Sequence, residues 1–442
     1  MRVILLAASL GILQAQTPDI GGVISKFQQK WAVAIPEFHG SGGAEGFMGT
    51  FNSTLRQQIE DSGVLSVVAS SLYPQRVPQT PQDFRKPSPW LTEWSGPPVS
   101  ATHLVFGYTG VQNDRLALFG WLLNLSQPDP VSAKVLGKVY FGSLDKEGAR
   151  KVAEEFAADI LQSFGVKSLI GTKIYFVSDR TGSKEIWSMD YDGSNQVQLT
   201  NFGTITQAPA VSADAKWLAY STLVKKIPAH QIVLQSTETK LRAPFDNPAA
   251  PTTSWPEFMP DGQRLLFASS ATGYTQIYEA NLKGGDRRQI TNSKAIDFSP
   301  RVNPKTSAQV LFISDRSGKQ QLWRMNIDGS DAEMLTNGEG EVANPAWNPD
   351  GQAVAFAWTN GYEIGGFNIF VMDVEKRVPV QLTKDSGVNE NPWWAPDGLH
   401  LVFSSRRNGT TQIYVMLADG QRVRALTSKG NNYQPVWANA LQ

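Results

Sequence analysis

Four sequence markers recur in register about every 45 residues through the C-terminal two-thirds of the chain, and no other feature constrains the fold as strongly. The first marker is an aromatic residue inside a short apolar run, at Phe176, Tyr220, Phe267, Phe312, Phe356 and Phe403. A second apolar pair follows each of these residues, and a Leu-Thr or Ile-Thr pair closes five of the six copies. The fourth marker is a proline that we expect to open the next strand, at Pro209, Pro256, Pro300, Pro345, Pro392 and Pro435.

Six copies of a unit with four short apolar strands predict a six-bladed β-propeller. We name the strands of a blade A to D, from the proline strand, which is innermost by analogy with other propellers, to the threonine strand. The array begins on a B-type strand at Lys173–Ser178 and ends on an A-type strand at Gln434–Trp437. We therefore expect the last strand to join the first three in one composite blade, which closes the ring and removes two exposed sheet edges.

The order of the strands fixes which loops share a face of the propeller. The A–B and C–D turns lie on one face and are tight and rich in Asp-Gly, which accepts the positive φ of such turns. The B–C and D–A loops lie on the opposite face and vary more in length and sequence. Because the D–A loops lead into the innermost strands, they surround the central channel. Binding residues often lie on variable loops held by a rigid scaffold, so we predict a ligand site at this channel rim.

Residues 1–15 are predicted to be a signal peptide. Arg2 precedes an apolar run from Val3 to Leu13, which is shorter than the roughly 20 residues that a membrane-spanning helix needs. The run matches the hydrophobic region of a signal peptide, and a buried N-terminal helix is the structural alternative. We expect an exported protein in a bacterial periplasm, with residues 16–30 as an N-terminal tail.

Residues 31–168 are predicted to form an α/β domain ahead of the propeller, which takes residues 173–442. Its expected elements are strands at 31–38, 64–69, 102–109, 114–125 and 132–142, and helices at 48–61 and 147–164. The second helix has apolar residues at helical spacing, and Asp145 or Ser143 would cap its start. The predicted fold class is mainly β: a C-terminal six-bladed β-propeller preceded by an N-terminal α/β domain.

Composition argues against several classes of function. The 442 residues include no cysteine, which excludes a disulfide framework, a thiol nucleophile and a cysteine zinc site. The 40 basic and 40 acidic side chains give zero net charge, which argues against general nucleic-acid binding. Neither the His-Glu-x-x-His nor the Gly-x-Ser-x-Gly pattern occurs. We therefore expect no catalytic residues, no metal site and no cofactor.

Two Ser-Asp-Arg-x-Gly loops, at Asp179-Arg180 and Asp315-Arg316, have two interpretations. Carboxylates around a channel mouth could hold a Ca²⁺ ion, which prefers six to eight oxygen ligands. Alternatively, each aspartate closes its own turn and the arginine forms a local pair. We favour the second interpretation because only two of the six blades carry the aspartate.

The whole arrangement resembles the TolB family of the periplasmic Tol–Pal system. The resemblance rests on the signal peptide, the strand ending at Phe38, the stretch Gly-Val-Lys-Ser-Leu-Ile-Gly171 and the repeats ending in Pro435-Val-Trp437. It implies a non-enzymatic adaptor whose channel rim binds the peptidoglycan-associated lipoprotein Pal. It further implies that the mature N-terminal strand engages the inner-membrane protein TolA. Such an adaptor helps to maintain outer-membrane integrity and to constrict the outer membrane at cell division.

The resemblance places the partner contacts just before the inner strands, at Thr252, Trp255, Asp297 and Phe298. Asn344, Asn391 and Gln434 precede the prolines of later repeats and complete our predicted rim set. Familiar members carry a histidine where this chain has Thr252. The segment 17–30 also departs from the family's short extended strand and has a partly helical pattern, which bears on TolA binding through this tail.

A second class of function stays open as an alternative. The chain could be a periplasmic hydrolase or lyase that uses the propeller channel, or an accessory domain of such an enzyme. That function needs a convergent set of acid, base or metal ligands, and the sequence shows no such set.

Overall fold

The computed structural model describes residues 31–441 apart from 85–89, 130, 225–228, 248–251 and 362–364. The predicted signal peptide and N-terminal tail lie outside the described residues. Among the helices that are described, none is both long and apolar enough to cross a membrane.

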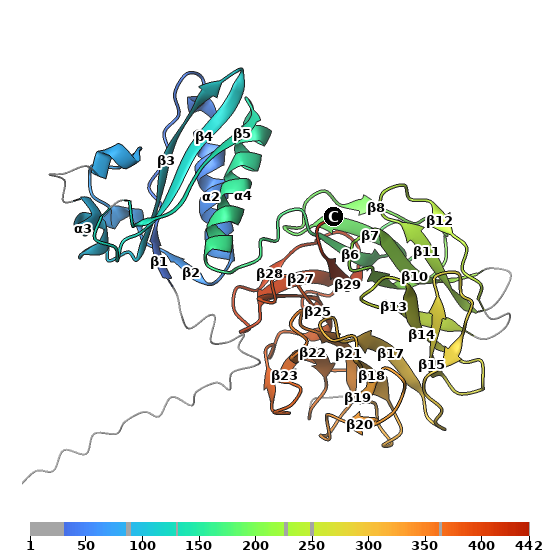
Figure 1. The fold of residues 1–442 in the computed structure, drawn as a ribbon. Helices are drawn as coiled ribbons and strands as arrows, with labels where there is room; N and C mark the ends of the chain where they lie inside the picture. The colour runs from blue at the N-terminus through green and yellow to red at the C-terminus, as the bar shows by residue number, and fades with distance from the viewer. Residues whose placement is uncertain are drawn as a thin grey trace, which may run out of the picture.

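The N-terminal unit is a five-stranded sheet with two helices on one face (Figure 1). The strand order is β2-β1-β3-β4-β5. The strands are β1 (Trp31–Ala34), β2 (Leu65–Val67), β3 (His103–Gln112), β4 (Arg115–Asn124) and β5 (Lys134–Ser143). The α-helices are α2 (Met48–Asp61), α3 (Trp90–Ser95) and α4 (Lys146–Ser163), and the short 3-10 helices are η1 (Glu45–Phe47), η2 (Ser70–Leu72) and η3 (Pro81–Phe84). The predicted helices at 48–61 and 147–164 correspond to α2 and α4.

The sequence of α4 explains its start and its packing. The Asp145 carboxylate accepts a hydrogen bond from the Gly148 amide at 2.7 Å, which satisfies one of the free N–H groups of the first turn. Val152, Phe156 and Ile160 are buried between the helix and the sheet, as their spacing predicts. Asp145 is therefore the N-cap, which settles the choice between it and Ser143.

The other strands form six four-stranded sheets arranged radially (Figure 1). In chain order their bounds are β6 (Lys173–Ser178), β7 (Glu185–Asp190), β8 (Val197–Gln198), β9 (Thr206–Val211), β10 (Trp217–Leu223), β11 (His230–Ser236), β12 (Arg242–Ala243), β13 (Thr253–Phe258), β14 (Arg264–Ser269), β15 (Gln276–Asn281), β16 (Arg288–Gln289), β17 (Asp297–Val302), β18 (Gln309–Ser314), β19 (Gln321–Asn326), β20 (Glu333–Met334), β21 (Val342–Trp347), β22 (Ala353–Trp358), β23 (Asn368–Asp373), β24 (Pro379–Gln381), β25 (Val388–Trp394), β26 (His400–Arg406), β27 (Thr411–Leu417), β28 (Arg424–Ala425) and β29 (Asn432–Ala438). One sheet has the order β29-β6-β7-β8, so the predicted composite blade is confirmed.

The recurring threonine fixes the connection between the two outer strands of a blade. In five blades its hydroxyl accepts a hydrogen bond from a backbone amide of the C strand, at Thr200, Thr291, Thr336, Thr383 and Thr427. The second repeat lacks the threonine, and there the Asn247 side chain accepts the hydrogen bond from the Ile232 amide at 2.9 Å. The sequence marker therefore reflects a buried backbone amide of the C strand that needs a hydrogen-bond acceptor in each blade.

The N-terminal unit contacts the propeller on the face of the A–B and C–D turns. At the end of α2, the Asp61 carbonyl lies 2.9 Å from Nε2 of His400, which begins a B strand. The neighbouring Glu60 carbonyl accepts a hydrogen bond from Arg422 in a C–D turn. The Gln58 amide donates to the Tyr191 hydroxyl at 2.6 Å, also beside a C–D turn. The D–A loops therefore lie on the face opposite this contact.

Both ring nitrogens of His400 face acceptors in this contact, which favours the protonated imidazolium. Nδ1 lies 2.6 Å from the Asp397 carboxylate, and Nε2 faces the Asp61 carbonyl. Burial lowers the pKa of His400, but the Asp397 charge and the two hydrogen bonds outweigh burial and raise the pKa above its usual value.

We expect the stability of the docked arrangement to decrease as the pH rises through the raised pKa of His400. Below the ordinary histidine pKa of about 6.5, His400 contributes its full stabilisation of the docked units. Above the raised pKa, His400 loses a proton and with it one of its two hydrogen bonds. Because hydrogen bonds to charged groups contribute about 1.5–3 kcal/mol, His400→Gln should destabilise the docked state at low pH by a similar amount. Thermal unfolding followed from about pH 5 to about pH 9, which covers both sides of the ordinary histidine pKa, measures this. Equal pH profiles for wild type and His400→Gln would contradict the assignment.

Candidate binding site at the channel rim

Each inner strand carries a β-bulge at the residue before the repeat proline. The residues at these six positions have φ between 48° and 53°, and they are Ala208, Trp255, Ser299, Asn344, Asn391 and Gln434. The strand pairing shifts register at the same place in every blade. The prediction that the proline opens the inner strand is therefore wrong: the proline lies within the strand. A proline has no N–H to donate, and a bulge is a site in a strand that tolerates this loss.

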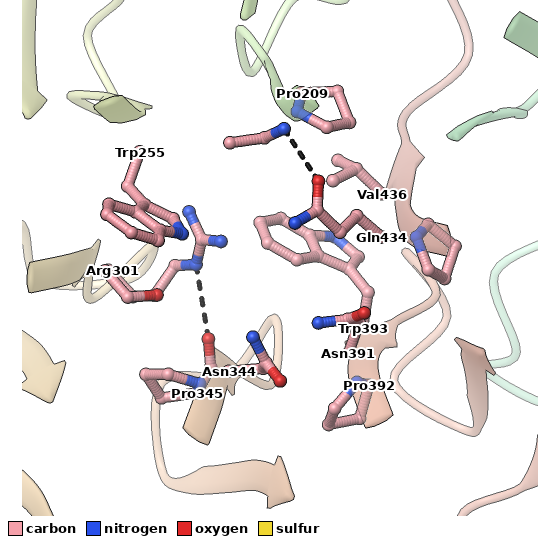
Figure 2. A pocket seen from close by; sticks show the side chains of 13 residues that line it. Pro209, Trp255, Arg301, Asn344, Pro345, Asn391, Pro392, Trp393, Gln434 and Val436 are labelled. Atoms are coloured by element: carbon pink, nitrogen blue, oxygen red, sulfur yellow. Dashed lines mark hydrogen bonds between the residues drawn. The ribbon is translucent and has the colours of Figure 1, made fainter. Parts of the chain in front are cut away.

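The six bulges together line a pocket at the channel rim. A left-handed backbone costs a non-glycine residue about 1–2 kcal/mol, yet this chain adopts it in all six blades, with no glycine at any of the positions. The bulge residues line a hollow of about 370 Å³, and Figure 2 shows side chains from several blades converging on it. Four predicted residues belong to this ring: Trp255, Asn344, Asn391 and Gln434. Sequence reasoning missed Ala208 and Ser299.

The other three predicted residues lie outside the ring. Phe298 is half-buried, and its ring lies 5.0 Å from that of Trp255, so the two form one aromatic pair. Thr252 precedes β13, and its amide donates to the Ser270 hydroxyl at 3.1 Å. The Asp297 side chain is fully buried and forms an ion pair with Arg316 at 2.7 Å. Its carboxylate is therefore engaged inside its own blade.

Arg301 forms the floor of the rim pocket, and sequence reasoning missed it. Its Nη1 donates to the Glu257 carboxylate at 2.9 Å, and its Nε donates to the Pro345 carbonyl at 3.2 Å. The guanidinium lies 4.8 Å from the centre of the Trp393 ring. The repeat could have pointed to this residue, because Glu257, Arg301 and Trp393 each directly follow a repeat proline.

Arg301 and Trp393 separate the rim pocket from a second hollow deeper in the channel. Both residues line both hollows, whereas Glu257 lines only the deeper one, which is open to solvent and has about 1150 Å³ of empty space. Burial raises the pKa of Glu257 despite the neighbouring Arg301. Glu257 therefore lies on the side of the constriction away from the rim.

The carboxylates of the two Ser-Asp-Arg loops take part in loop-to-loop hydrogen bonds. Asp179 accepts from the Asn431 amide and side chain at 2.7 and 2.9 Å, and Asp315 accepts from the Ile296 amide at 2.7 Å. Arg180 and Arg316 each lie over two aromatic rings of their own blades. In the described part of the chain, no group of three His, Asp or Glu side chains could hold a metal ion.

Comparison with known proteins gives both sequence and fold matches. A family model described as the TolB beta propeller domain matches residues 161–357 and 332–440. The Protein TolB homolog of Chlorobium chlorochromatii is 36% identical over 173 residues, which cover 38% of each chain. The Tol-Pal system protein TolB of Desulfosudis oleivorans is 34% identical over 163 residues, covering 36% of this chain and 35% of that one. The aligned segments thus span little more than a third of these relatives.

A solved structure extends the similarity of fold to nearly the whole chain. The crystal structure of TolB from Acinetobacter baumannii matches with a TM-score of 0.76 and 21% identity, covering 93% of this chain and 97% of that one. The predicted fold class, a six-bladed propeller with a preceding helix-and-sheet unit, is confirmed.

Proposed function

Because the chain belongs to the TolB family of Tol–Pal proteins, we propose that it is an adaptor that binds a Pal-like lipoprotein through the channel rim. The observation that carries this proposal is the pocket formed by the six bulges. It lies on the face opposite the N-terminal unit, so a partner can reach it while the two units stay docked. Trp255 and Phe298 supply a half-buried aromatic pair beside it, and aromatic residues dominate the energy of many interfaces.

We assign the rim a binding role and not a catalytic one. The titratable groups at the channel constriction, Arg301 and Glu257, are paired with each other. The rim pocket is otherwise lined by amide, hydroxyl, proline, aromatic and aliphatic side chains. This combination suits recognition of a protein surface, whereas a hydrolase or lyase needs an acid and a base free to act on a substrate.

The proposal extends to the place and purpose of the interaction. We propose that the protein acts in the periplasm, after removal of its signal peptide, and supports outer-membrane integrity and constriction at cell division. Binding of TolA through the tail at 16–30 stays a prediction, because the tail lies outside the described residues.

Site-specific photo-crosslinking in cells tests the proposal. Ile296 lies in a D–A loop at the rim, and its side chain is 43% exposed. A photoreactive phenylalanine derivative at this position should crosslink to the Pal-like lipoprotein. Val378, in a C–D turn of the opposite face, is 52% exposed and serves as the matched control. Absence of the lipoprotein adduct at Ile296, or equal adducts at both positions, would overturn the proposal.

A further inference from the structure

We propose that the rim pocket recognises a carboxylate of the bound protein and that Arg301 receives it. This inference rests on the proposed function and deepens it, since it names the chemical group that the partner inserts. The charge distribution along the channel is the first observation. Arg301 is the one charged residue among those that line the rim pocket in the described part of the chain. Its counter-charge, Glu257, lies on the far side of the constriction.

The hydrogen-bonding groups at the rim favour an acceptor as ligand. The Gln434 side-chain oxygen accepts a hydrogen bond from the Ala208 backbone amide at 2.8 Å. A backbone amide can only donate, so the orientation of the Gln434 amide is fixed and its NH₂ group is left for a ligand. Arg301 uses Nη1 and Nε within the protein. Among the described residues its Nη2 has no hydrogen-bond partner. The pocket therefore offers donors, which an anionic group satisfies.

The Trp393 ring holds the guanidinium in place. The Arg301 guanidinium lies over this ring, and Trp255 lines the same pocket. A planar guanidinium stacked over a ring matches the planar, two-oxygen geometry of a carboxylate. The Arg301 side chain is only 13% exposed, and low exposure to water strengthens the attraction between the two charges.

Glu257 should oppose this recognition. A bound carboxylate shares Arg301 with Glu257, so two negative groups compete for one cation. Glu257→Gln removes the competitor and keeps the shape of the side chain. We therefore expect it to tighten binding several-fold, whereas Arg301→Gln weakens binding. If the pair only stabilised the channel, both substitutions would weaken binding.

The test is calorimetric titration with the soluble domain of the Pal-like lipoprotein from the same organism. Glu257→Gln is compared with the Glu257→Gln/Arg301→Gln double variant, which leaves no unpaired buried charge. We expect the double variant to bind at least about tenfold more weakly than Glu257→Gln, as for loss of one partner of a buried charge pair. Arg288→Gln serves as the control, because that arginine pairs with Glu279 away from the channel.

The partner is varied to locate its carboxylate. Acidic residues of the lipoprotein are changed singly to the corresponding amides, and a version with an amidated C-terminus is tested in parallel. One such change should weaken binding to wild type and have no further effect on the double variant. Weaker binding to Glu257→Gln than to wild type, or equal binding to Glu257→Gln and the double variant, would overturn the carboxylate assignment alone. Failure of the lipoprotein to bind wild type would overturn the proposed function as well.

Discussion

Deletion of residues 431–442 is expected to abolish the cooperative unfolding transition of the propeller. These residues contain β29, the inner strand of the composite blade, which pairs along β6. Val436 and Trp437 are buried in this strand, and burying two such side chains contributes about 3–6 kcal/mol. The Trp437 indole also donates to the Thr172 hydroxyl at 2.9 Å, and the Asn432 side chain donates to Gln412 of the preceding blade at 2.8 Å.

The loss should exceed the sum of these contacts because deletion also opens the ring. Without β29, β6 becomes an unpaired edge strand, and such edges promote association between chains. Calorimetric melting measures the effect, and deletion of residues 441–442 is the control, because Leu441 is exposed. A peptide covering residues 430–442, added in trans, should restore part of the transition. A cooperative transition at the wild-type temperature in the truncated chain would contradict the role of β29 in closing the ring.

The blade topology could be predicted from the sequence because its markers satisfy local demands of each blade. The six recurring aromatic residues are buried near the centres of the B strands, and the threonine hydroxyls accept backbone hydrogen bonds at a constant offset. Asn247 shows why a marker can be absent without loss of the blade, since a different side chain accepts the same hydrogen bond. Such patterns involve residues that lie close together in the chain, so they can be recognised in a single sequence.

The rim pocket was harder to predict because it depends on where side chains point around the bulges. We expected the prolines to open the inner strands, which left the residues before them in loops except at Gln434. The bulge brings those residues into the strand and toward the channel, so Asn344 and Gln434 lie in one pocket although 90 residues separate them.

The ion pair of Arg301 and Glu257 could not be identified from the sequence alone. The two residues are 44 positions apart, and they meet because successive blades bring equivalent positions side by side. The same limit applies to His400 and Asp61, which are 339 positions apart. A repeat shows which positions are equivalent, but not which of them face one another across the channel or between the two units.

Trp255→Ala and Phe298→Ala should each weaken binding of the Pal-like lipoprotein at least about thirtyfold, which corresponds to the roughly 2 kcal/mol typical of an interface hot spot. The two rings pack against each other at the rim, so loss of either one leaves the other without support. Alanine at position 255 keeps a side chain with the same backbone preference, so the positive φ of 49° adds no new strain there. The melting curve of Trp255→Ala should stay close to that of wild type, because Trp255 is only half-buried. Phe298→Ala should melt at a lower temperature while still folding, because Phe298 also packs against a buried cluster that includes Trp347 and Phe356.

The central claim is that the channel rim is the binding surface, and titration of the purified lipoprotein domain into these variants tests it most directly. Leu241→Ala is the control, because Leu241 lies in a C–D turn of the opposite face and is 71% exposed. The account predicts wild-type affinity for Leu241→Ala and affinity at least about thirtyfold weaker for Trp255→Ala and Phe298→Ala. Wild-type affinity in both rim variants, measured on folded protein, would contradict it.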